Sequence, residues 1–223
     1  MKHYLSFIAK IGIVPLILIL SCAPVTLYTI DMNYTPSGTV STGGGDMDNI
    51  RLTVAEFIDS RNMEDKMMIG RVVSSDGVTT PVMPKHIKPV DAVTTGIRKC
   101  LSAEGYSLSP DTPVWNSDND SIGTKPGDIL IGGTIDKLEV VCRKDGIEKR
   151  YNANVKLTIV FANVRTARIF HRMEIETNPS LVHVRFSEEI LEKQINKALS
   201  SSIEQVFGNR ETMRKILKEA AGE

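Results

Sequence analysis

Residues 150–206 constrain the fold more than any other part of the chain. Apolar side chains fill every second position from Tyr151 to Phe161, which is the period of a strand with one buried face. After a short turn around Arg165, residues 169–175 keep one face apolar in a second strand. Behind Ser187 the apolar residues recur at helical spacing, which predicts an amphipathic helix of roughly 30 Å. Strands joined by a short turn pair antiparallel, so this helix is expected to cover their apolar face.

The region before this segment adds a hairpin and a second helix. Two β-rich runs flank Ser74-Ser-Asp-Gly77, and an Asp-Gly pair in that position predicts a hairpin. Pro81 should confine the second run to a sheet edge, because proline cannot donate to a ladder. Asp91 is expected to cap a helix that ends at Gly105.

The strand expected over 128–142 changes its apolar parity along its length. This change predicts a β-bulge near Asp136-Lys137. The order strand, hairpin, helix, three strands and helix predicts an α+β fold. We expect a two-layer sandwich in which two long helices cover one face of a mainly antiparallel sheet. The other face should be wet or covered by the hairpin.

The start of the chain has the composition of an export signal. Residues 1–10 contain Lys2 and Lys10 and no acid, and the apolar stretch 11–20 is too short to span a bilayer. The sequence Ile19-Leu-Ser-Cys22 resembles the bacterial lipobox. The resemblance implies removal of residues 1–21, a diacylglyceryl thioether on Cys22, and acylation of the new amino terminus by a fatty acid such as palmitate. The alternative is a plain signal peptide in which Cys22 is incidental.

The same resemblance gives a location and a partner. Ala23 follows the cysteine, at the position where an aspartate would retain a lipoprotein in the inner membrane. By resemblance to enterobacterial sorting, the sequence therefore implies the periplasmic side of the outer membrane. Acyl chains on Cys22 would make the membrane a partner, since two or more chains anchor a protein stably. Residues 22–48 should form a flexible tether, because 35–45 is rich in Gly, Ser and Thr, although 25–32 could add an edge strand. Residues 49–223 should form a single periplasmic domain.

Charge and composition exclude some classes of function. The whole chain has 27 cationic and 27 anionic residues, and loss of Lys2 and Lys10 leaves 25 against 27, a net charge of −2. No basic stretch is dense enough for a nucleic-acid partner. The histidines lack zinc spacing, and Asp118-Asn-Asp120 fails as a calcium loop because Ile129 stands where a glutamate is required. We therefore expect no metal, no cofactor and no catalytic residue.

Two cysteines and one charge pair are the remaining candidate site residues. Cys100 and Cys142 are expected either to form a disulfide in the oxidising periplasm or to remain two buried thiols. Asp59 and Arg61 could contact a partner. The alternative is a turn in which Asp59 accepts backbone hydrogen bonds and Arg61 forms an ion pair with it. Residues 210–221 could form a short helix that binds another chain or docks on its own domain.

The chain resembles the YajG-like family of bacterial lipoproteins. The resemblance rests on these stretches in order: Cys22, Asp59-Ser-Arg61, Ile69-Gly70, Leu101-Ser-Ala-Glu-Gly-Tyr106, Gly133-Thr-Ile-Asp-Lys-Leu138 and the long last helix. It implies a non-catalytic envelope lipoprotein that binds an envelope protein or aids envelope assembly. Two alternatives stay open: an auxiliary lipid-binding component of an envelope lipid-transport system, and a hydrolase that uses Asp59 with loop 112–127.

Overall fold

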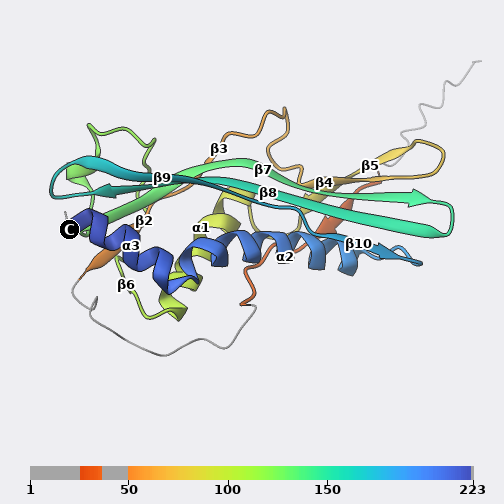
Figure 1. Cartoon of the computed structure of the whole chain (residues 1–223). Coiled ribbons are helices and arrows are strands. Elements are labelled where there is room, and N and C mark those ends of the chain that lie inside the picture. The colour runs from red at the N-terminus through yellow and green to blue at the C-terminus, as the bar shows by residue number, and fades with distance from the viewer. Residues whose placement is uncertain (1–25, 37–49, 222–223) are drawn as a thin grey trace, which may run out of the picture.

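The computed structural model of the chain describes residues 26–36 and 50–221, which form a mixed α+β fold (Figure 1). In chain order the elements are β1 (Tyr28–Ile30), β2 (Arg51–Val54), β3 (Ile58–Asp59), β4 (Gly70–Val73), β5 (Thr79–Pro84), α1 (Pro89–Ala103), β6 (Ser107–Leu108), the 3₁₀ turn Ile122–Thr124, β7 (Ile129–Asp145), β8 (Glu148–Asn163), β9 (Arg168–Thr177), β10 (Ser180–His183), α2 (Glu188–Phe207) and α3 (Arg210–Ala221). The α+β class is confirmed. The sheet is curled into a half-barrel, and in the described residues three helices, α1, α2 and α3, rather than two lie on its concave side.

The long hairpin β7–β8 is the centre of the sheet. It is antiparallel along its whole length, and β9 and β10 pair antiparallel with the far edge of β8. The other edge of β7 pairs in turn with β2, β3 and β4, all of them parallel to it. The predicted bulge is confirmed, because the β7–β8 register shifts between Ile135 and Lys137 and leaves Asp136 outside the ladder.

The hairpin predicted around Ser74-Ser-Asp-Gly77 is confirmed as β4 and β5, but β5 is not the edge strand that Pro81 predicted. It pairs antiparallel with β4 and also parallel with β1. The ladder to β1 involves only Val82, Met83 and Pro84, so Pro81 lies just outside it and its missing N–H is not needed there.

α1 starts at another residue than predicted, and α3 joins the two predicted long helices on the sheet. α1 begins at Pro89, behind Lys88, so Asp91 lies in the first helical turn rather than at the cap. Ser187 is the N-cap of α2 as predicted, although its side chain makes no capping hydrogen bond. α3 buries one face on its own domain, which is the docking alternative for residues 210–221. None of the described helices is long and apolar enough to cross a membrane.

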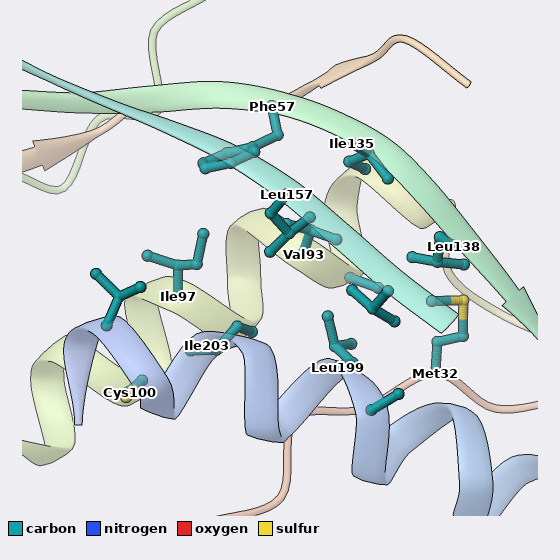
Figure 2. Close-up of a cluster of buried hydrophobic side chains, with 14 of the residues drawn as sticks. Met32, Phe57, Val93, Ile97, Cys100, Ile135, Leu138, Leu157, Leu199 and Ile203 are labelled. Carbon is teal, nitrogen blue, oxygen red and sulfur yellow. The ribbon is translucent and has the colours of Figure 1, made fainter. Parts of the chain in front are cut away.

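The main core lies between the helices and the concave face of the sheet (Figure 2). Figure 2 shows Val93 and Ile97 of α1 and Leu199 and Ile203 of α2 pointing toward Ile135, Leu138 and Leu157 of the sheet. These side chains are at most 1% exposed. Most of the buried residues of this core are aliphatic, and its aromatic members are Phe57, Tyr151, Phe161 and Phe207.

A second, smaller core covers part of the convex face. Trp115 packs there with Ala55, Leu130 and Val160, and its indole N–H donates to the carbonyl oxygen of Asp118 at 2.9 Å. Gly132 lies directly beneath the indole, and a Cβ at this position would come within 2.6 Å of the ring. The convex face was expected to be wet or covered by the hairpin, but loop 112–127 covers this part of it.

Candidate functional site

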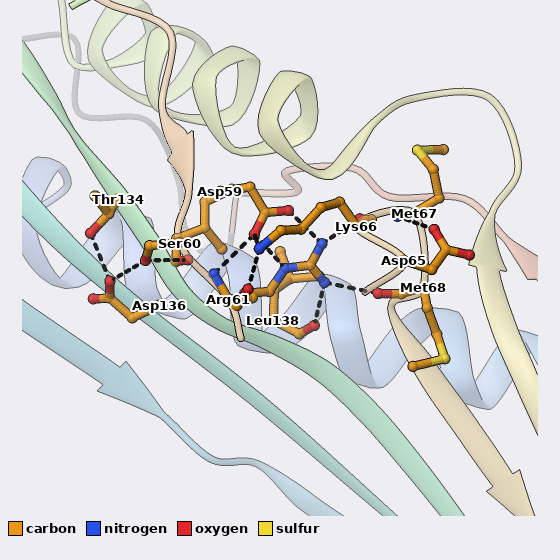
Figure 3. Close-up of polar contacts among 11 residues, drawn as sticks. Asp59, Ser60, Arg61, Asp65, Lys66, Met67, Met68, Thr134, Asp136 and Leu138 are labelled. Atoms are coloured by element: carbon orange, nitrogen blue, oxygen red, sulfur yellow. Dashed lines mark hydrogen bonds and ion pairs between the residues drawn. The ribbon is translucent and has the colours of Figure 1, made fainter. Parts of the chain in front are cut away.

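The Asp59–Arg61 pair lies where β3 meets the loop that follows it, beside β7 (Figure 3). The guanidinium of Arg61 donates to both carboxylate oxygens of Asp59, at 2.9 Å from Nε and 2.6 Å from Nη2. It also donates to the carbonyl oxygens of Met68 at 2.9 Å and Leu138 at 3.2 Å, and to that of Lys66. One side chain thus joins β3, the loop and β7.

Burial and charge fix the state of this pair. The side chain of Arg61 is 4% exposed and that of Asp59 is 11% exposed, while Lys66 Nζ lies 3.8 Å from Asp59 Oδ1. Burial acts to raise the pKa of Asp59, but the hydrogen bonds and charge of Arg61, helped by Lys66, outweigh it and lower the pKa. This is the geometry of the turn-forming alternative. A partner contact through Asp59 and Arg61 would have to displace these bonds, and it stays a prediction.

Asp136, the bulged residue of β7, is the centre of a neighbouring polar cluster. Its Oδ1 accepts from the hydroxyls of Ser60 at 2.8 Å and Thr134 at 2.7 Å, and its Oδ2 accepts from Thr158 at 2.6 Å. Burial opposes ionisation, but the three hydroxyls outweigh it and the pKa of Asp136 is lowered. A carboxylate held ionised in this way is a poor general base. The sequence pattern located the bulge but not these partners.

A shallow groove of about 560 Å³ adjoins both clusters on the convex face. Its lining residues are Arg61, Asn62, Met63, Met68, Arg71, Asp136, Lys137, Leu138, Glu139 and Asn154. The charges in the groove are of both signs and are largely paired: Arg71 with Glu139, and Lys137 with Glu176 at 3.2 Å. The groove can bind a polar surface of mixed charge, but its groups are arranged as ion pairs rather than as a nucleophile with a base.

Loop 112–127 is held by contacts within the loop and with the second core. Asp118 Oδ1 accepts from the N–H of Ser121 at 3.0 Å and from its hydroxyl at 2.6 Å, which closes a local turn. The loop packs through Trp115 on the second core, whereas the ion-pair partners of Asp59 are Arg61 and Lys66. Among residues 26–36 and 50–221, no three His, Cys, Asp or Glu side chains gather as metal ligands would.

The two cysteines of the domain are buried free thiols, which is the second of the two alternatives. Cys100 lies on α1 beside Tyr34, and burial raises the pKa of its thiol to about 11. Cys142 lies on β7 beside Tyr151, and burial also raises its pKa. Neither thiol is prepared for nucleophilic or redox chemistry.

Residues 31–35 form an N-terminal strap along α2 that the sequence analysis missed. The backbone N–H groups of every second strap residue donate hydrogen bonds to side chains spaced four residues apart on α2. The donor and acceptor residues are Asp31 and Glu192 (3.0 Å), Asn33 and Asn196 (2.9 Å), and Thr35 and Ser200 (2.9 Å). Two extended residues rise about 6.7 Å and four helical residues about 6 Å, so the two spacings match. The Asn196 amide also donates to the carbonyl oxygen of Asp31 at 3.1 Å.

The strap and Ile30, the last residue of β1, are also packed into the core. Ile30 and Met32 are each 1% exposed, and Tyr34 lies against Gly96 of α1, where a Cβ would come within 3.1 Å of it. Residues 26–36 of the predicted tether therefore belong to the folded domain, which corrects its boundary. The alternation of Ile30 and Met32 was the available signal. Cys22 and residues 37–48 lie outside the described residues.

Solved structures with related folds come from several bacteria. Protein XCC0632 from Xanthomonas campestris, of the family DUF330, matches with a TM-score of 0.55 at 11% identity, over 86% of this chain and 99% of that one. A neuraminyllactose-binding hemagglutinin homolog from Helicobacter pylori matches at 0.43, with 13% identity over 82% and 98% of the two chains. Lipoprotein GNA1162 from Neisseria meningitidis matches at 0.36, with 10% identity over 72% and 99%.

These likenesses bear on the fold alone. The similarity to XCC0632 supports the α+β architecture over nearly the whole described chain, and the two lower scores carry no argument. No family model and no curated protein sequence matches the chain. The YajG-like resemblance therefore stays a prediction.

Proposed function

We propose that the protein is a lipoprotein of the bacterial outer membrane, anchored on the periplasmic side through acyl chains on Cys22, that acts by binding and not by catalysis. The observation that carries the proposal is the lipobox-like Ile19-Leu-Ser-Cys22, which follows a short apolar stretch and directly precedes a folded domain. The fold shared with XCC0632 is compatible with this function but does not specify it.

The site geometry favours binding over catalysis. Asp59 and Asp136 are the most elaborately bonded carboxylates of the described chain, and in both cases the bonds fix an ionised, structural group. The groove beside them offers paired charges and hydrogen-bonding groups to another surface. We infer that an envelope protein is the partner, with the protein serving as an assembly or accessory factor.

The lipid-carrier alternative needs an apolar cavity between helices and sheet. In the described residues this space is filled by the side chains of the main core (Figure 2), so nothing in it favours lipid carriage. A hydrolase would require Asp59 to leave Arg61 before it could act as a base.

Metabolic labelling tests the proposal. Cells that express the full chain and receive radiolabelled palmitate should incorporate label into the wild-type protein and not into Cys22→Ser. Crosslinking in intact cells, followed by identification of the crosslinked proteins, should then give a discrete envelope partner. Unlabelled wild-type protein would remove the basis of the proposal, and a hydrolytic activity lost in Asp59→Asn would contradict its non-catalytic part.

A further inference from the structure

The strap sets the length of chain available between the lipid anchor and the folded domain. This inference rests on the proposed acylation of Cys22. The first described residue, Thr26, is four residues further on, and four residues span at most about 14 Å when fully extended. Because residues 28–35 are bonded to β5 and α2, the longer tether expected from composition does not separate the domain from the bilayer.

The contacts of Tyr28 show which end of the domain this short link reaches. The Tyr28 ring lies 5.0 Å from that of Phe186, and its hydroxyl lies 3.4 Å from Lys144 Nζ. Lys144 is the penultimate residue of β7, and Phe186 lies between β10 and α2. β1, drawn in red in Figure 1, is thus in the half of the domain that ends in the β7–β8 turn, with Tyr28 level with Val140 through β5 and β4, whereas the C-terminal helix lies at the opposite end.

Exposed apolar side chains are concentrated at the same end. In the described residues nine large apolar side chains are exposed. Six of them lie just before β1, in the β4–β5 and β7–β8 turns, or in and beside β10. They are Leu27, Val78, Ile147, Leu181, Val182 and Val184. Ile147, at the tip of the β7–β8 turn, is 81% exposed. The β4–β5 turn lies here because β4 runs parallel to β7, with Val73 opposite Arg143.

Charges of both signs border these side chains. Arg143, Lys144, Lys149 and Arg150 flank the β7–β8 turn, and Asp145 and Glu148 lie within the same hairpin, so residues 143–150 carry a net charge of +2. The apolar groups would supply attraction to the boundary between headgroups and acyl chains, and this net positive charge would add attraction to anionic headgroups.

We propose that this membrane-facing end, formed by Leu27, the β4–β5 and β7–β8 turns and residues 181–184, rests on the bilayer that holds the acylated Cys22. Since β7 alone spans roughly 55 Å, the orientation places α3 and loop 112–127 far from the lipid. It leaves the groove beside Asp59 and Asp136 and the opposite end of the domain, and not the turns, open to a partner in the periplasm.

Depth-dependent quenching tests the orientation. A fluorescent probe is attached to Ile147→Cys or Val182→Cys in the full acylated chain, because Cys22 is blocked by lipid and Cys100 and Cys142 are buried. The matched control is Lys218→Cys on α3, which is exposed at the opposite end. The proteins are placed on vesicles of phosphatidylethanolamine and phosphatidylglycerol, with or without spin-labelled lipid. Emission should be lost at 147 and 182 and unchanged at 218.

The outcomes separate this inference from the function on which it rests. Protein that floats with the vesicles but shows no loss at 147 and 182, or equal loss at 218, overturns the orientation and leaves the anchor intact. A second copy of the protein could instead cover this end. In that case the probes at 147 and 182 would be shielded from solvent equally in detergent and on vesicles, without quenching by spin-labelled lipid, and this result also overturns the orientation. Protein that does not float contradicts the acylation and removes both.

Discussion

Replacing Arg61 with methionine removes the guanidinium that holds β3, its loop and β7 together. It leaves the Asp59 carboxylate, which is 11% exposed, without its two strongest hydrogen bonds, and leaves the carbonyl oxygens of Met68, Leu138 and Lys66 short of a donor. Removing one member of a buried ion pair costs about 3–5 kcal/mol. Lys66 is 3.8 Å from the carboxylate and can move closer, so we expect a loss of about 3 kcal/mol, at the low end of the range.

Urea unfolding of the mature Cys22→Ser chain, followed by circular dichroism, measures this loss. The matched control is Arg71→Met, since Arg71 pairs with Glu139 but both side chains are about 40% exposed, and an exposed pair contributes roughly 0–1 kcal/mol. Asp59→Asn combined with Arg61→Met should be less destabilised than Arg61→Met alone, because no unpaired charge remains. Equal losses for Arg61→Met and Arg71→Met would refute this reasoning.

Three further predictions follow from the described contacts. The pKa of Asp136 is lowered in the native state, so its ionised form stabilises the native state above the unfolded pKa of about 4. This contribution is lost as the pH falls below that value through the lowered pKa, so the urea midpoint of Asp136→Asn should vary less with acidification than that of the wild type. Gly132→Ala places a methyl group within 2.6 Å of the indole of Trp115, so it should destabilise the protein by about 1–3 kcal/mol and shift the tryptophan emission to longer wavelength. Cys100 and Cys142 should resist a thiol reagent at pH 8 in the native protein and react on unfolding, because both are buried and have raised pKa values.

Each of these predictions has a result that contradicts it. Parallel pH profiles for wild type and Asp136→Asn would mean that the three hydroxyls do not bind the carboxylate. The control for Gly132→Ala is Gly123→Ala in loop 112–127, where a Cβ meets only Ala167 at 3.7 Å. Equal emission shifts for the two variants would show that the indole does not rest on Gly132. Rapid reaction of either thiol, or a disulfide in the purified protein, would refute the buried free thiols.

Sequence patterns predicted the elements whose signal lies within a few neighbouring residues. The alternation in 150–161, the parity change at Asp136 and the Asp76-Gly77 turn each correspond to an observed strand, bulge or hairpin. Each of these signals reflects a period or a turn within a few residues, which is why sequence alone revealed it.

Non-local contacts were not predictable in this way. β3 is two residues long and pairs parallel with β7 some 76 positions later, as Ile58 opposite Thr134 shows, so no local period reports it. The strap is a similar case, since its N–H groups bond to side chains of α2 about 160 positions away. The sequence pointed to Asp59 and Arg61 as candidate site residues. It did not show the second cluster, because the hydroxyls that bind Asp136 come from the loop after β3, from β7 and from β8.

The central claim is that residue 22 carries the lipid that anchors the domain. Intact-mass analysis of the protein purified from the bacterial envelope tests it most directly, together with fragmentation of the N-terminal peptide. The account predicts a chain that begins at Cys22 and carries a diacylglyceryl group on the sulfur and a further acyl chain on the amino group. A chain that retains residues 1–21, or that begins with an unmodified Cys22, would contradict it.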